Sequence, residues 1–163
     1  MDTQKQHGEA VRLALAELAE CRPRLLQTGH EMIKAGNGAV YDVDMFTIGA
    51  VKRAVSLAKG FEVLVYAWNL MCARALLRMQ IDTAIRFSAL RLVDNPNSFA
   101  KEVFSGKQIN KLKDRDGTRM TDARLVAHLA PVAPWLPDVY RNTSGYVHLS
   151  GSHIFAPIYH LKR

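Results

Sequence analysis

The segment FEVLVYAWNLMCARALLRMQIDTAIRFSALRLV, from Phe61 to Val93, gives the strongest indication of the fold. Its apolar residues recur at helical spacing and occupy most sides of a helix, which is typical of a helix buried by its neighbours. The most apolar part, Val63 to Ala73, is interrupted by Asn69. Since a membrane span needs roughly 20 apolar residues, the stretch predicts a long buried central helix and no membrane anchor.

Apolar positions at helical spacing continue on both sides of this stretch, and no run of four or more residues alternates in the manner of a strand. We therefore expect a single all-α domain over residues 1–163, a bundle of about five to seven helices. Gly60 marks either a break or a close helix contact, and Trp135 and Leu136 are expected to pack on the core. Arg22-Pro23 is expected to interrupt the first helical pattern, and Asp44 is expected to cap the helix that begins at Met45. The other expected helices run from about Gln4 to Glu20, Leu25 to Ile33, Met45 to Lys59, Ser98 to Phe104, Asp122 to before Pro131, and onward from Pro137 or Asp138.

The composition is that of an ordinary soluble globular protein, with 48% hydrophobic and 23% charged residues in 163. The N-terminus carries charged residues within its first turns, so we expect no signal peptide and a cytoplasmic location. Cys21 and Cys72 could pair, but buried free thiols are the favoured interpretation for a cytosolic protein.

The chain is basic, with a net charge of +7, and its charge is unevenly distributed. No acidic residue follows Asp138, whereas two arginines, one lysine and three histidines do. Such a bias would concentrate a polyanion such as RNA near the surface. The other interpretation is a solvated basic surface without a partner.

A stripe of charged residues runs along the central helix, because Arg74, Arg78, Asp82 and Arg86 follow one another at intervals of four. Apolar residues surround them, and a charge away from solvent must be paired because an isolated buried charge costs many kcal/mol. One interpretation is an internal Arg–Asp–Arg network that fixes helix packing. The other places Asp82 and one arginine beside a catalytic pair, where the carboxylate orients an imidazole and the cation holds phosphate.

That catalytic pair is found in the run YRNTSGYVHLS, from Tyr140 to Ser150, in which Arg141 and His148 bracket six residues. Histidine exchanges protons near neutral pH, and arginine is always charged and matches the geometry of phosphate. In a helix, a separation of seven residues is two turns, so both side chains would leave the same face. The glycine at 145 is disfavoured within a helix, and a helix beginning near Ser144 is the other arrangement.

The arginine and histidine at this spacing resemble the R-x(4–6)-H signature of the HEPN superfamily (higher eukaryote and prokaryote nucleotide-binding domains). A polar residue after the arginine, here Asn142, and a long polar-striped core helix carrying the run Leu77 to Asp82 also fit that family. The resemblance implies a homodimer in which two motifs line one cleft, and metal-independent cleavage of RNA without a cofactor. His148 would act as general base or acid, and Arg141 would stabilise the transition state.

The resemblance further implies supporting roles for Asn142 and Ser144, which could donate hydrogen bonds to phosphate or hold the histidine, and base stacking by Tyr146. The first hypothesis is therefore an endoribonuclease, a toxin or defence effector held in check by an antitoxin or regulatory protein. The second is a non-catalytic nucleotide- or RNA-binding or assembly module with the same fold. His153 and His160 lack a nearby carboxylate and predict no metal site.

Overall fold

The computed structural model describes residues 8–144, and within this range the chain is all-helical. The expected all-α bundle of five to seven helices is confirmed. The structure has six α-helices and two short 3₁₀ turns in this range, η2 (Ala89–Arg91) and η3 (Ile109–Lys111). The α-helices are α1 (Glu9–Ala35), α2 (Asp42–Tyr66), α3 (Leu70–Ser88), α4 (Pro96–Phe104), α5 (Asp122–Leu129) and α6 (Leu136–Ser144).

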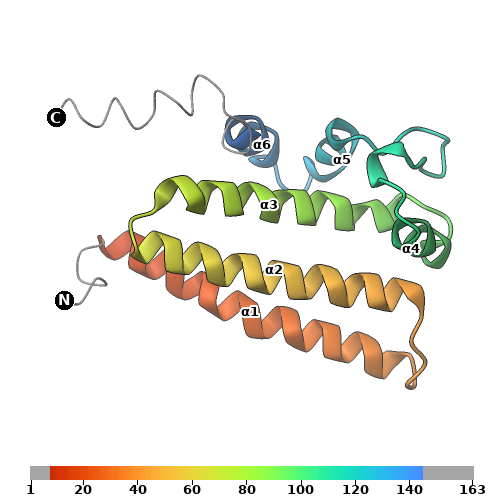
Figure 1. Cartoon of the computed structure of the whole chain (residues 1–163), viewed down its shortest axis with the longest axis horizontal. Helices are drawn as coiled ribbons and strands as arrows, with labels where there is room; N and C mark the ends of the chain where they lie inside the picture. Colours follow the sequence, from red (N-terminus) through yellow and green to blue (C-terminus); the bar gives the residue numbers. More distant parts are fainter. Residues whose placement is uncertain (1–7, 145–163) are drawn as a thin grey trace.

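The helix α3 lies at the centre of the bundle (Figure 1). It packs against the long helix α2 on one side and against the short helices α5 and α6 on the other. The helix α1 covers the far side of α2, and α4 contacts α2 near one end of the bundle. No helix among residues 8–144 is long and apolar enough to span a membrane.

The main core lies between α3 and the segments that follow it, and Ile85, Met120 and Leu125 are its largest fully buried residues. Burying a side chain of this size stabilises the fold by roughly 1.5–3 kcal/mol. A smaller cluster of Leu15, Val65 and Ala73 joins α1, α2 and α3. Leu136 belongs to the main core as expected, but Trp135 is 59% exposed, so its expected burial is wrong.

The expected central helix from Phe61 to Val93 is two helices, because the chain reverses at residues 67–69. Trp68 adopts a left-handed backbone conformation with φ of 57°. The side chain of Asn69 accepts a hydrogen bond from the backbone N–H of Cys72 at 3.2 Å and caps α3. An asparagine cap satisfies a donor that the first turn leaves free, so the polar interruption of the apolar run marks a helix boundary.

The opposite correction applies to α1, which continues through Pro23 without a break. Pro23 lies on the exposed side of α1, where the lost backbone hydrogen bond is tolerated at the helix surface. Beside it, Arg22 forms an ion pair with Glu62 of α2 at 2.5 Å and fixes α1 at this level. Packing against α2 therefore outweighs the local preference of the proline.

The start of α2 and its passage through Gly60 both have a clear physical cause. Tyr41 is the N-cap, and the carboxylate of Asp44 accepts a hydrogen bond from its backbone N–H at 2.8 Å, so Asp44 lies inside the first turn. A Cβ atom at Gly60 would lie 2.8 Å from Cδ1 of Leu76. The close-contact interpretation of Gly60 is thus confirmed, and α2 and α3 approach closely there.

Candidate functional site

The charged stripe of α3 forms a connected ion-pair network. Nε of Arg78 lies 3.2 Å from Oδ1 of Asp82, and Nη1 of Arg86 lies 3.2 Å from the same oxygen. Both pairs join residues four apart on one helix face. Arg74, at the start of the stripe, lies on an exposed part of α3.

Two residues from the later helices extend this network. Nη2 of Arg86 donates to both carboxylate oxygens of Asp122 on α5, at 3.0 and 3.2 Å. The hydroxyl of Tyr140 on α6 donates to the same carboxylate at 3.0 Å. The network therefore ties α3, α5 and α6 together through side chains.

Arg78 is the most buried member, with only 9% of its side chain exposed. Its Nη1 donates to the carbonyl of Tyr140 at 2.8 Å, and its guanidinium carbon lies 3.6 Å from the centre of the Tyr140 ring. A guanidinium over an aromatic face is attracted by the ring quadrupole. The buried charge is therefore met by one carboxylate, one carbonyl and one ring.

Burial of the Tyr140 hydroxyl, together with its hydrogen bond to Asp122 and the charge of that carboxylate, raises its pKa above the ordinary value of 10.0. The positive charge of Arg78 acts in the opposite direction without reversing the shift. Tyr140 is therefore a neutral donor at physiological pH, as its hydrogen bond to Asp122 requires.

Arg141 follows Tyr140 directly, but its side chain faces solvent. Its side chain is 74% exposed and pairs with Asp138, one turn earlier, at 2.5 Å. Asn142 is also exposed, Ser144 is half-buried, and Thr143 between them is buried. The structure thus brings Arg78, Asp82 and Arg86 together with Tyr140, and presents Arg141 and Asn142 to solvent from the same helix.

Two of the expected site residues, His148 and Tyr146, lie outside the described residues 8–144. The distance between the Arg141 and His148 side chains is therefore still a prediction from spacing. Within the described range, no group of three or more histidine, cysteine, aspartate or glutamate side chains is placed to hold a metal ion.

Sequence patterns did not single out Asp122 and Tyr140 as network members. Asp122 was visible only as the start of a helix, and Tyr140 only as the neighbour of Arg141. The stripe has three arginines and one carboxylate, Asp82. This excess of positive charge was the sequence feature that pointed to a further carboxylate from another helix. Both thiols, expected to be buried, are free as expected but exposed in the described chain.

A carboxylate outside the stripe, that of Asp114, is buried and paired. Asp114 accepts hydrogen bonds from the backbone N–H groups of Thr118 at 2.8 Å and Asp116 at 3.1 Å, and from Nη2 of Arg124 at 3.0 Å. Burial alone would raise the pKa of Asp114, but these bonds outweigh it and hold the pKa below its ordinary value of 3.8. Asp114 fixes the loop between α4 and α5.

Comparison of the chain with protein-family models, with curated proteins and with solved structures finds no match in any of the three.

Proposed function

We propose that this protein is a metal-independent endoribonuclease of the HEPN type, in which Arg141 and His148 act on one phosphodiester. The observation that carries the proposal is the exposure of Arg141 on a helix whose opposite face is fixed by buried polar contacts. A cation that cleaves RNA must reach a phosphate in solvent, and a rigid helix keeps it in position.

The proposed reaction needs no group other than the side chains and the RNA. His148 takes the proton of a ribose 2′-hydroxyl, and the 2′-oxygen attacks the adjacent phosphorus. The bond from phosphorus to the 5′-oxygen breaks, and that oxygen leaves with a proton from an acid such as the His148 of a second subunit. The products are a 2′,3′-cyclic phosphate and a 5′-hydroxyl end.

Arg141 stabilises the negative charge that develops on the phosphorane-like transition state. Its present partner, Asp138, is equally exposed, and an exposed ion pair contributes only about 0–1 kcal/mol. A phosphate group can therefore displace Asp138 at little cost. In the proposal, Asn142, which is also exposed on α6, donates to a phosphate oxygen.

The cellular role that accompanies this activity is a cytoplasmic toxin or defence effector. Two copies pair so that both motifs line one cleft, and an antitoxin or regulatory protein holds the enzyme in check. These parts of the proposal rest on the resemblance of the motif and on the basic charge of the chain.

A non-catalytic RNA-binding or assembly module is the second candidate, and one observation favours it. The residues that could have supported the catalytic pair, Arg78, Asp82 and Arg86, are engaged with one another and with α5 and α6. Such contacts hold helices together whether or not the surface is catalytic.

Expression of the wild type beside Arg141→Ala and His148→Ala separates the two candidates. We expect the wild type to slow growth and fragment cellular RNA, and both variants to leave RNA intact. Lys34→Ala, at an exposed cation of α1, is the control that should behave as the wild type. Equal growth and equally intact RNA for all four proteins would remove the enzyme and favour the binding module.

A further inference from the structure

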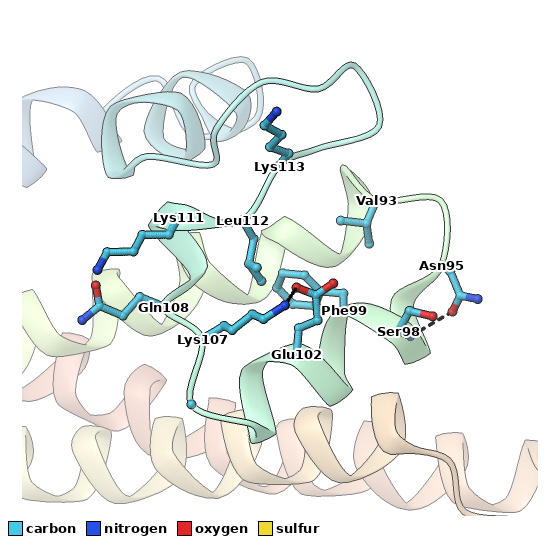
Figure 2. Close-up of a pocket in the computed structure, with 11 residues that line it drawn as sticks. Val93, Asn95, Ser98, Phe99, Glu102, Lys107, Gln108, Lys111, Leu112 and Lys113 are labelled. Carbon is cyan, nitrogen blue, oxygen red and sulfur yellow. Dashed lines mark hydrogen bonds and ion pairs between the residues drawn. The ribbon is translucent and has the colours of Figure 1, made fainter.

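Three neighbouring hollows surround the C-terminal end of α4. The first, of about 780 Å³, lies between α4 and the chain that follows it and includes Lys107, Lys111 and Lys113 (Figure 2). The second, of about 430 Å³, shares Lys107 and Gln108 with the first. The third, of about 500 Å³, shares Arg86, Val103 and Ile109 with the second. Because they share lining residues, we treat them as one surface, the α4 groove.

The charge of the α4 groove is positive. Lys107, Lys111 and Lys113 line its first part, and Arg53 and Arg86 line its last part. Its two carboxylates already face cations, since Glu102 lies 3.0 Å from Lys107 and Asp82 lies 3.2 Å from Arg86. The excess charge at Lys111 and Lys113, both exposed, is therefore available to a polyanion.

The lysines owe their positions to the way α4 ends. Gly106 has a φ of 89°, and the backbone N–H groups of Gly106 and Lys107 bond to the carbonyls of Val103 and Glu102 at 3.0 and 3.1 Å. This glycine-terminated cap satisfies the last carbonyls of α4 and turns the chain sharply. Figure 2 shows Leu112 pointing toward Phe99 of α4, which anchors the lysine-bearing segment on the core.

The last part of the α4 groove is apolar and aromatic. Phe104 is 55% exposed, Met45 52% and Phe87 37%, and all three line this part beside Arg53. Exposed aromatic rings next to cations are the arrangement on which unpaired bases stack while their phosphates meet positive charge. A duplex keeps its base faces covered by stacking and would leave this apolar surface unused.

We propose that the α4 groove binds a single-stranded RNA segment, with its phosphates on Lys111 and Lys113 and a base against Phe104. This deepens the proposed function, on which it rests, by assigning the surface that holds the substrate. The α4 groove shares no lining residue with α6, from which the exposed Arg141 projects.

The test measures binding of a fluorescent single-stranded 2′-O-methyl RNA, which lacks the attacking hydroxyl and so reports binding without cleavage. Lys111→Gln combined with Lys113→Gln should weaken binding about tenfold and lower the slope of log affinity against log salt by about 1.4, or about 0.7 for each phosphate contact. Phe104→Ala should weaken binding about fivefold or more through lost stacking.

Matched controls come from the same chain. Lys34→Gln combined with Lys52→Gln removes the same charge from α1 and α2, and Trp135→Ala removes an equally exposed aromatic ring. Both should bind as the wild type. Equal weakening by the two lysine pairs would overturn the proposal, since attraction would then follow net charge alone.

Two further outcomes also contradict the groove as a single-strand site: equal affinity for duplex RNA, or an unchanged affinity of Phe104→Ala. Weakened binding by the groove variants, in a protein that leaves unmodified RNA uncut, would support the groove and refute the nuclease. Normal binding by the groove variants, in a protein that cuts unmodified RNA, would refute the groove and support the nuclease.

Discussion

Asp82 is the carboxylate that two arginines of α3 share. Its carboxylate meets both Arg78 and Arg86, and its side chain is 27% exposed. Replacing one partner of a buried pair leaves a charge without compensation. Removal of Asp82 leaves the buried Arg78 without a carboxylate, whereas Arg86 keeps Asp122.

We predict that Asp82→Ala lowers the free energy of unfolding by about 2 kcal/mol, below the range for fully buried pairs because Asp82 is partly exposed. Urea denaturation measures the change. Glu31→Ala, at an exposed carboxylate of α1 with a hydrogen bond to Gln27, is the control and should shift stability by less than about 0.5 kcal/mol. An unchanged midpoint for Asp82→Ala would show that the stripe contributes nothing to packing.

Asp138 restrains Arg141 in the proposed nuclease. We predict that Asp138→Asn raises the rate of RNA cleavage up to about fivefold, since an exposed ion pair is worth at most ~1 kcal/mol. Initial rates on a short RNA measure the effect, and Asp94→Asn, at another exposed carboxylate, should leave them unchanged. A slower Asp138→Asn enzyme would mean that Asp138 positions Arg141 instead of competing for it.

At the scale of elements, Asp114 fixes the turn within the loop from Ser105 to Thr121. Asp114 accepts the turn's backbone N–H groups, and Gly117 takes the left-handed conformation that the turn requires, with φ of 78°. Thr121 then caps α5 by accepting from the backbone N–H of Arg124 at 3.3 Å.

The lowered pKa of Asp114 gives this loop a pH dependence. Because the folded pKa lies below the unfolded one, the ionised carboxylate stabilises the fold above the ordinary value of 3.8, and this contribution disappears as the pH falls through the folded pKa. We predict that the stability difference between wild type and Asp114→Asn is largest near pH 6 and shrinks below pH 3.8.

Urea titrations at successive pH values measure this difference. Asp116→Asn is the control, because Asp116 is exposed and its Oδ2 lies 3.8 Å from Nη2 of Arg124, the arginine that also pairs with Asp114. A difference that stays constant down to the lowest pH would contradict the assigned role of Asp114.

The helices themselves were largely predictable, whereas their boundaries were not. The helical spacing of apolar residues predicts the all-α class because burial on one face is a local pattern. The helix α1 continues through Pro23, where a break was expected, and a boundary lies at Asn69, where one helix was expected. Tertiary packing decides whether a proline interrupts a helix and whether a polar residue caps one. The stripe was predictable from spacing, but Asp122 and Tyr140 reach it only through the packing of α5 and α6.

At the scale of the whole molecule, we expect a dimer in which the Arg141 and His148 motifs of two copies line one cleft. We predict that light scattering gives twice the monomer mass at micromolar concentration, without RNA. Arg141→Ala should also be dimeric, because its side chain is presented to solvent in the described chain. A monomer that nevertheless cleaves RNA would contradict the shared cleft while leaving the chemistry of the pair intact.

The proposed reaction has Arg141 and His148 cut RNA through its own 2′-hydroxyl. Mass spectrometry of fragments from a short RNA, incubated with purified protein and a chelator, tests this most directly. We expect 5′ fragments ending in a 2′,3′-cyclic phosphate for the wild type, and none for His148→Ala, Arg141→Ala or a 2′-O-methyl RNA. Uncut RNA with the wild type, or equal cleavage of the 2′-O-methyl RNA, would contradict it.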